Sequence, residues 1–396
     1  FWNEILGKRK KMAWEIDGLV ISVNKNKTYA QLGVAGKAPR GAVAFKFPGQ
    51  ESTTKVKDII VQVGRTGVLT PVALLEPVNI AGVTVSRATL HNEDEIHRLD
   101  VRVGDTAIVQ RAGDVIPDVV RVLKNLRPRG AKEFHFPKKC PVCNHQVVRA
   151  KGEAAHKCVN KNCPAQHREG LYHFVSRRAF EIVGLGAEIV DKLVDAGLIK
   201  TAADFFKLEP KDLLELEGFA EVSANKLVAA IRKSKKISLA RFIYALGIIH
   251  VGEETANLLA IYFGDFNDLM SAGEEELQRV PGIGEKAAQS IKEWFGNKNN
   301  KDLLQKLLKV VDIQKPPKIS KKLSGKIFVF TGTLETITRN TAKEKIRLMG
   351  GDVSGSVSKE TDFVVAGENP GSKYDKAKSL GVKIASEREF LNIINE

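Results

Sequence analysis

The chain has 396 residues, 43% of them apolar, and a formal net charge of +15 at pH 7. This length predicts about two to four domains. Because the sequence has neither an apolar stretch of about eighteen residues nor a signal peptide, we expect a soluble cytosolic protein and exclude a membrane-spanning or secreted one.

The positive charge is concentrated in residues 121–180, which hold 14 lysines and arginines against 3 acidic residues. A concentrated basic surface favours a polyanionic partner, most often nucleic acid. The alternative is a basic protein that has no such partner.

Two apolar runs, residues 14–23 and 42–48, predict strands within a first segment of residues 1–57. The carboxylate of Asp17 and the glycine after it interrupt the first run, and Lys46 is the one lysine among the apolar residues of the second. A lysine in such a strand either extends to solvent or meets a phosphate. The pattern alone is also that of two ordinary strands.

Residues 58–135 alternate apolar and polar side chains, with glycine or proline turns about every eight to twelve residues, and this spacing predicts a small β-barrel. Arg65 and Thr66 lie in one turn between glycines, and Arg111 ends a strand shortly before Gly113. Glycine lets the backbone approach a phosphate while a guanidinium binds it. Spacing alone leaves open that both arginines are solvated turn residues.

All the cysteines of the chain fall in residues 136–168, as two close pairs separated by fourteen residues. Such spacing predicts a tetrahedral zinc site of four thiolates, and a site closed in this way is structural. The alternative is two structural disulfides or four unrelated thiols, although nothing in the sequence indicates secretion. His145, His156 and His167 lie nearby, but four thiolates already complete the site. The predicted ligands are Cys140, Cys143, Cys158 and Cys163.

Residues 169–314 have helical periodicity and four glycine-containing turns, whose last positions are 34, 32 and 32 residues apart. Repeats of this period predict paired helices. The backbone N–H groups at each following helix start, together with the helix dipole, bind phosphate without reading base sequence. A helical array without a ligand is the alternative. The candidate phosphate-binding residues are Gly184, Gly186, Gly218, Gly252, Gly282 and Gly284.

Two of these turns lack a glycine where the pattern expects one, since Ala220 and His250 occupy the positions. A Cβ there costs close approach or a left-handed conformation. We therefore expect the first and fourth turns to make the better phosphate contacts.

A basic, proline-containing linker, residues 315–324, leads to a last segment, residues 325–396. In that segment strands alternate with helices, which predicts a parallel sheet.

Taken in order, these segments resemble the bacterial NAD-dependent DNA ligases. The runs around Asp17 and Lys46 are similar to the last motifs of covalent nucleotidyltransferases, and the barrel is similar to the oligonucleotide-binding (OB) fold of these ligases. The cysteines resemble their zinc finger, the glycine turns resemble helix-hairpin-helix motifs, and the last segment resembles a BRCT domain. The implied fold class is multidomain α+β, with an OB-fold barrel, a four-cysteine zinc finger, an all-α domain and an α/β domain.

This resemblance implies a function in replication and repair, the sealing of nicks between 3′-hydroxyl and 5′-phosphate ends of duplex DNA. The implied cofactors are NAD+ and Mg2+, in addition to structural zinc. It implies that Asp17 and Lys46 contact the cofactor, and that the barrel residues and turn glycines named above bind DNA. It further implies a monomer in the bacterial cytoplasm, at the nucleoid and away from membranes.

The sequence also departs from that family. The nucleophilic lysine of a Lys-x-Asp-Gly motif is absent, and Ser22 stands where the family has a further lysine. A covalent adenylate requires such an amine, so we predict that this chain alone clamps DNA and does not react with NAD+. Because the sequence opens on Phe1, we expect a fragment of a longer ligase. The alternative is a non-catalytic scaffold that binds nicks or junctions.

Overall fold

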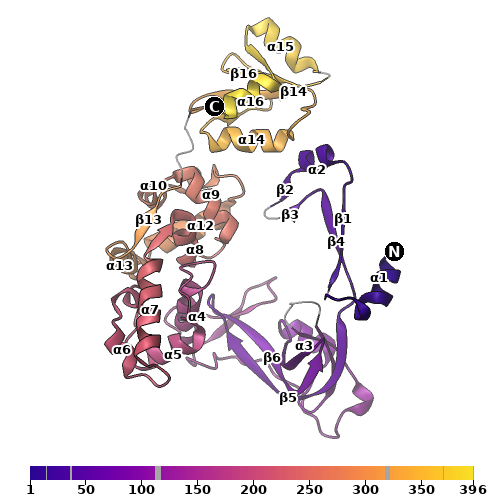
Figure 1. Ribbon diagram of the computed structural model, residues 1–396, viewed down its shortest axis with the longest axis vertical. Coiled ribbons are helices and arrows are strands. Elements are labelled where there is room, and N and C mark those ends of the chain that lie inside the picture. Colours follow the sequence, from indigo (N-terminus) through magenta and orange to yellow (C-terminus); the bar gives the residue numbers. More distant parts are fainter. Residues whose placement is uncertain (15, 36–37, 112–116, 317–321, 369, 396) are drawn as a thin grey trace. The chain divides into compact units, whose positions relative to one another are not determined.

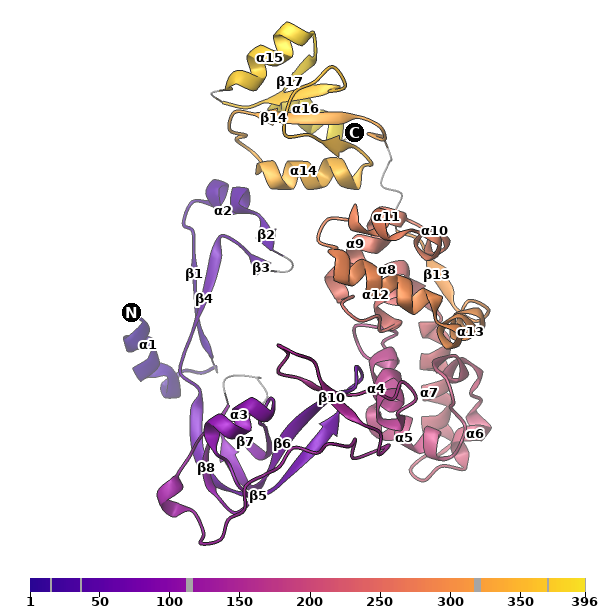
Figure 2. The ribbon, with the colours of Figure 1, turned by 180° about the vertical axis from the view of Figure 1, so that it is seen from behind.

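The structure is a computed structural model that describes residues 1–14, 16–35, 38–111, 117–316, 322–368 and 370–395. Contacts within the chain divide it into two compact units, Phe1–Ile21 with Ala44–Leu171 and Ser22–Val43 with Tyr172–Glu396. Figures 1 and 2 show their elements from opposite sides. Within the described ranges, no helix is both long and apolar enough to cross a membrane.

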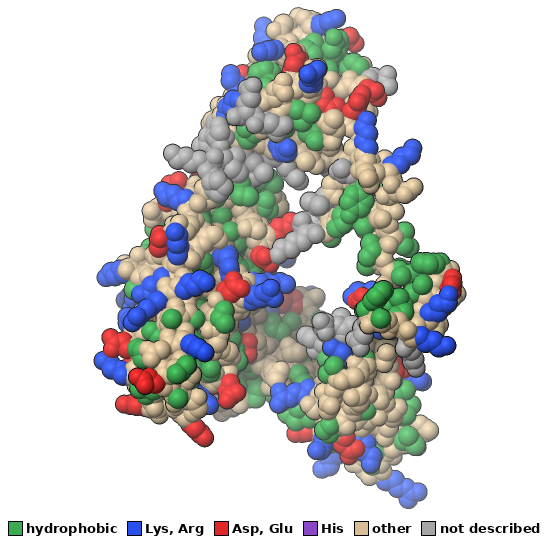
Figure 3. Space-filling model, viewed as in Figure 1, with side chains coloured by type: hydrophobic (Ala, Val, Ile, Leu, Met, Phe, Trp, Pro, Cys, Tyr) green, Lys and Arg blue, Asp and Glu red, His purple; other side chains and the backbone are tan. Residues whose placement is uncertain are grey.

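The two strands predicted near the start of the chain, β1 (Gly18–Ser22) and β4 (Ala42–Lys46), pair with each other. A Cβ at Gly18 would lie 2.6 Å from the Cα of Lys46, so this close approach of the strands requires glycine. Figure 3 shows hydrophobic side chains gathered over this strand pair. The short neighbouring elements are α1 (Trp2–Lys8), α2 (Asn26–Leu32), β2 (Val34–Ala35) and β3 (Ala38–Pro39).

The predicted barrel is confirmed: five strands pair in the order β6-β5-β8-β9-β7, and β7 closes the barrel by pairing with β6. Its core contains residues that alternate along the strands, such as Val56, Ala73 and Val109, each almost fully buried. The first strand of the barrel, β5, begins at Gln50. The sequence analysis had placed the start of the barrel later, at residue 58. The elements are β5 (Gln50–Val63), β6 (Val68–Ile80), β7 (Val83–Thr89), α3 (Glu93–Leu99), β8 (Thr106–Arg111) and β9 (Asp118–Val122).

The cysteine segment, residues 136–168, extends the sheet of the barrel, which the sequence did not predict. Its hairpin of β10 (Val147–Arg149) and β11 (His156–Cys158) pairs with β6 through the antiparallel contact of β11. The helix α4 (Pro164–Val175) follows directly. We call residues 136–168 the cysteine module.

The following segment is helical, as predicted, and a short parallel pairing of β12 (Lys236–Ser238) with β13 (Asp312–Gln314) joins two of its loops. Phenylalanines fill its core, among them the fully buried Phe205 and Phe242. The helices are α5 (Ala187–Asp195), η3 (Ala202–Lys207), α6 (Pro210–Leu214), α7 (Glu221–Ser234), α8 (Leu239–Ala245), α9 (Glu253–Phe263), α10 (Phe266–Ser271), α11 (Glu274–Gln278), α12 (Glu285–Gly296) and α13 (Lys298–Leu307).

The last segment contains the predicted parallel sheet, in the order β15-β14-β16-β17. Alternate residues of the central strand enter different cores: Phe328 packs with Phe390 of the last helix, and Val329 packs with Ala377. Helices therefore cover both faces of the sheet. The elements are β14 (Ile327–Thr331), α14 (Arg339–Leu348), β15 (Asp352–Val353), β16 (Phe363–Ala366), α15 (Ser372–Leu380), β17 (Lys383–Ser386) and α16 (Glu387–Asn395).

Candidate metal centre and nucleic-acid interface

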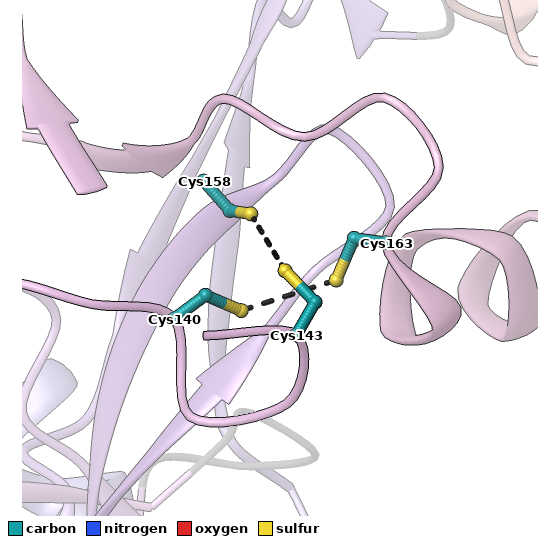
Figure 4. A group of neighbouring side chains, drawn as sticks. All are labelled: Cys140, Cys143, Cys158 and Cys163. Carbon is teal, nitrogen blue, oxygen red and sulfur yellow. Dashed lines mark hydrogen bonds between the residues drawn. The ribbon is translucent and has the colours of Figure 1, made fainter. Parts of the chain in front are cut away.

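The four cysteines of the cysteine module converge on one point (Figure 4), with their sulfur atoms within 4.8 Å of one another. The Sγ atoms of Cys140 and Cys163 are 3.9 Å apart, and those of Cys143 and Cys158 are 3.5 Å apart. A tetrahedron with Zn–S bonds of about 2.3 Å has edges of about 3.8 Å. These free thiols therefore fit zinc and are too far apart for disulfides.

The surroundings of the thiols shift their pKa values in different directions. Burial opposes the Cys143 thiolate, but hydrogen bonds from the backbone N–H of His145 and from the Asn160 side chain lower the pKa of the Cys143 thiol to about 6. Burial raises the pKa of Cys158 to about 12 and also raises the pKa of Cys163. Zinc binding must therefore displace protons from the buried thiols.

Two of the neighbouring histidines are engaged by other groups. Nδ1 of His145 lies 3.0 Å from the backbone oxygen of Cys143, and Nε2 of His156 lies 3.4 Å from a carboxylate oxygen of Glu93. The His156 ring also stacks on Phe136. These contacts leave the four sulfur atoms as the ligand set.

Arg65 and Thr66 form the tip of the turn between β5 and β6, which we call the barrel turn (residues 64–67). The N–H of Gly67 donates to the oxygen of Gly64 at 2.9 Å, and this bond closes the turn. Gly67 is buried and left-handed, with φ +81°. Arg65 is half-buried and Thr66 is exposed, so the structure places both side chains at one end of the barrel.

The second predicted barrel site is only partly described. Arg111 is the last residue of β8 and pairs with Gln50 of β5. Gly113 lies outside the described residues. The position of Arg111 at a strand end agrees with the sequence pattern, and its role in binding DNA remains a prediction.

The four glycine-containing turns, which we call the hairpin turns (residues 183–186, 217–220, 249–252 and 281–284), share one backbone geometry. In each, the second residue is left-handed and the fourth is the N-cap of a helix. The left-handed residues are Gly184, Gly218, His250 and Gly282, with φ between +66° and +90°. The N-cap residues are Gly186 of α5, Ala220 of α7, Gly252 of α9 and Gly284 of α12.

This geometry corrects one expectation from the sequence. Ala220 was expected to carry a steric cost, but its N-cap position is extended, with φ −124°, and an alanine adopts that conformation without left-handed strain. His250 does adopt the left-handed conformation, with φ +66°. Of these two turns, only the third therefore carries the cost of a left-handed residue with a side chain.

The hairpin turns open onto free space. A Cβ built at Gly186, Gly252 or Gly284 would meet no atom within 4 Å, and all six candidate glycines are exposed. Inside α5 the first backbone N–H that bonds to the N-cap oxygen is that of Val190. The N–H groups before it point out of the helix start, as an anion site requires.

Asp17 and Lys46 come together across β1 and β4. The Lys46 Nζ lies 3.3 Å from a carboxylate oxygen of Asp17, and both side chains are 55% exposed. The N–H of Phe47 also donates to the backbone oxygen of Asp17 at 2.8 Å. The structure thus brings together two residues from motifs that are distant in the sequence, whereas their contact with a cofactor remains a prediction.

Comparison with family models gives one match after another along the chain. The matched models are the NAD-dependent DNA ligase adenylation domain (residues 1–50), the NAD-dependent DNA ligase OB-fold domain (53–131), the NAD-dependent DNA ligase C4 zinc finger domain (139–165), a SAM-like helix-hairpin-helix tandem (177–233), a helix-hairpin-helix motif (241–304) and a BRCT domain (318–394).

Curated relatives named DNA ligase match nearly the whole chain. The protein of Pelotomaculum thermopropionicum is 52% identical over 387 residues, which cover 97% of this chain and 57% of the relative. Those of Desulforamulus reducens and Coxiella burnetii are 47% and 48% identical, with 100% of this chain and 60% and 59% of the relatives covered. The chain thus spans less than two thirds of the length of these relatives.

Proposed function

We propose that this chain, which belongs to the NAD-dependent DNA ligases, clamps nicked duplex DNA so that the ends of the nick are held for sealing. The proposal includes a role in replication and repair, as a monomer at the bacterial nucleoid. The domain matches and the named relatives support the family. Residues of the hairpin turns and of the barrel support the binding of DNA.

The observation that carries the proposal is the common geometry of the hairpin turns. In each, a left-handed residue stands two positions before the N-cap of a helix, and the three N-caps that are glycines face open space. Backbone N–H groups and the positive end of the helix dipole favour a phosphate oxygen there, whatever the base. Four such sites in one domain suit a partner with regularly spaced phosphates.

The barrel contributes guanidinium groups. Arg65 in the barrel turn and Arg111 at the end of β8 are the candidates, and an arginine binds a phosphate through two parallel hydrogen bonds. Together with the net charge of +15, these residues favour a binding energy that is mostly electrostatic. Binding should accordingly be nearly independent of base sequence.

The chemistry of sealing needs groups beyond this chain. NAD+ and Mg2+ supply, when bound, the adenylyl group and the neutralisation of phosphate charge. The exposed Asp17 carboxylate and Lys46 ammonium suit the two sides of such a site, the first for a cation and the second for a phosphate. The sequence holds no Lys-x-Asp-Gly motif, so within this chain these residues bind and orient.

Titration of the chain with nicked and intact duplexes over a salt series tests the proposal. The logarithm of affinity should fall linearly with the logarithm of salt concentration, by about 0.9 per phosphate contacted. Nicked duplexes of unrelated sequence should bind with similar affinities, and the nicked form should bind more tightly than the intact form. A flat salt dependence would overturn the clamp.

Incubation with NAD+ labelled in its adenylyl group tests whether this chain can form the covalent adenylate by itself. We expect no stable protein–AMP adduct, because the required lysine motif is absent. An adduct resistant to denaturation would show that another lysine serves as the nucleophile.

A further inference from the structure

We propose that the cysteine module is a positioning device for the barrel turn, and that Gly67 and Gln166 are the positioning residues that connect the metal centre to Arg65. This inference rests on the proposed DNA clamp, because it explains how one predicted phosphate contact is held in place. It assigns the metal a function in DNA binding in addition to its structural one.

The connection begins at a metal ligand. The backbone N–H of Cys158 donates to the oxygen of Gly67 at 2.9 Å. This bond continues the β11–β6 pairing, in which Lys157 lies opposite Val68. The same residue thus offers its thiolate to the metal and its backbone to the barrel turn, one residue beyond Thr66.

Gly67 fits this junction because it has no side chain. A Cβ there would lie 2.9 Å from the backbone oxygen of Cys158 and 2.9 Å from Nε2 of Gln166. Real Cβ atoms rarely approach backbone so closely, and the left-handed φ of +81° also favours glycine. Any substitution at Gly67 must therefore push the barrel turn and the cysteine module apart.

Gln166 binds the backbone carbonyl group of Cys158. Its Nε2 donates to the oxygen of Cys158 at 3.3 Å and to the oxygen of Asn160 at 3.1 Å. The amide side chain, in the first turn of α4, therefore fixes the loop between the ligands Cys158 and Cys163. Cys158 is held from both sides, by Gly67 through its N–H and by Gln166 through its C=O.

The metal centre and the two strands that flank the barrel turn also share one core. Val63 of β5 and Leu69 of β6 are buried in the same cluster as three of the cysteines. A rigid core on both sides of a turn reduces the freedom that Arg65 and Thr66 would lose on binding a phosphate. When the metal leaves, this core loses the cross-link that closes it.

The experiment measures the affinity of the full chain for a nicked duplex over a salt series, for four variants. These are Arg65→Ala, Gln166→Ala, the double variant, and Gln146→Ala as the matched control. Gln146 is an exposed glutamine of the same module. Zinc content is measured for each variant by a colorimetric chelator assay.

We expect Arg65→Ala to weaken binding about tenfold and to reduce the salt slope by about one contact. Gln166→Ala should reduce the slope by the same amount with its zinc retained, and the double variant should bind like Arg65→Ala alone. Gln146→Ala should bind like the parent chain. Additive losses in the double variant, or an unchanged slope in Gln166→Ala, would overturn the inference.

A second measurement covers the case in which Gln166→Ala loses zinc. Removal of zinc by a chelator should lower the salt slope of the parent chain by about one contact more than that of Arg65→Ala. Equal changes in the two proteins would overturn the inference. If Arg65→Ala binds as tightly as the parent chain, the barrel contact of the proposed function fails instead, so the two failures are distinguishable.

Discussion

The barrel turn and the hairpin turns are both candidate phosphate sites built around a left-handed residue, which is a glycine in all of them except the third hairpin turn, yet they are held in different ways. At Gly67 the glycine is required by packing, because the cysteine module occupies the place of a side chain. At Gly184 an added Cβ would have a leucine methyl group as its nearest atom, 3.8 Å away, so packing leaves room for a side chain. Only the left-handed φ of +88° favours glycine there. The barrel turn is thus held by the residues packed around it. The hairpin turns are held by the conformational preference of their own backbone, which recurs in each repeat.

The largest expected effect follows from removing the support of the barrel turn. Cys163→Ser replaces a fully buried ligand, and a structural zinc site that loses a ligand loses most of its binding free energy. We expect loss of zinc and unfolding of the cysteine module, detected as rapid proteolysis within residues 136–168. The hairpin turns should keep their protection, since their helices do not depend on the metal.

Val142→Ser is the control for that variant, because Val142 lies between two ligands and is 53% exposed. It should keep zinc and resist the protease. If Cys163→Ser retains stoichiometric zinc and its resistance, the cysteines do not form the closed site that their spacing and geometry indicate.

The next largest effect is the loss of stability when alanine replaces the glycine of each kind of turn. Gly67→Ala should lower the free energy of unfolding by about 3 kcal/mol, because a left-handed alanine costs about 1–2 kcal/mol and the contact with Cys158 adds overpacking. Gly184→Ala should cost only about 1–2 kcal/mol, from the left-handed conformation alone. Denaturant titration of both variants measures the difference, and equal losses would mean that the junction yields to a side chain.

The sequence alone could not predict that packing holds the barrel turn whereas backbone preference holds the hairpin turns. The cysteine spacing and the repeat of the hairpin turns are local patterns, so they predicted that the four cysteines come together and where the helices start. The pairing of β11 with β6 joins residues about 90 positions apart, and no local pattern specifies such a register. Gly67 and Gln166 are ordinary residues until that pairing brings them together.

The turns also show where a pattern was interpreted too simply. Ala220 and His250 were treated alike because each replaces a glycine. They occupy different positions of the turn, and only the position of His250 is left-handed. The repeat had to be aligned by backbone conformation before the cost of each Cβ could be assigned.

A smaller effect separates DNA binding from stability at the open turns. Gly284→Val introduces a side chain where no protein atom lies within 4 Å, at an extended φ of −89° that valine adopts. We expect a change in unfolding free energy within about 1 kcal/mol, but an affinity for nicked duplex about five- to tenfold lower, because the side chain would obstruct the approach of a phosphate to the N–H groups.

The matched control is Gly273→Val, at the N-cap of α11, which is equally open and lies outside the hairpin turns. It should leave the affinity unchanged. Equal losses for both variants would point to a general effect of valine at helix starts, and no loss for Gly284→Val would remove the fourth turn from the interface.

The smallest expected effect is a gain in stability, in contrast to the losses predicted above. His250→Gly places glycine in a left-handed position, as in the other three turns, and relieves about 1–2 kcal/mol of strain. Glycine also increases the freedom of the unfolded chain, which offsets about 0.4–1 kcal/mol. We therefore expect a net gain of about 0.5–1 kcal/mol in the free energy of unfolding, measured by denaturant titration.

His135→Gly provides the contrast, since this exposed histidine is not left-handed and its replacement should only destabilise. A loss of stability in His250→Gly would mean that the imidazole makes a contact whose value exceeds the strain. In that case the third turn, like the barrel turn, would be held by a side chain, and the distinction between the two kinds of turn would not extend to all four repeats.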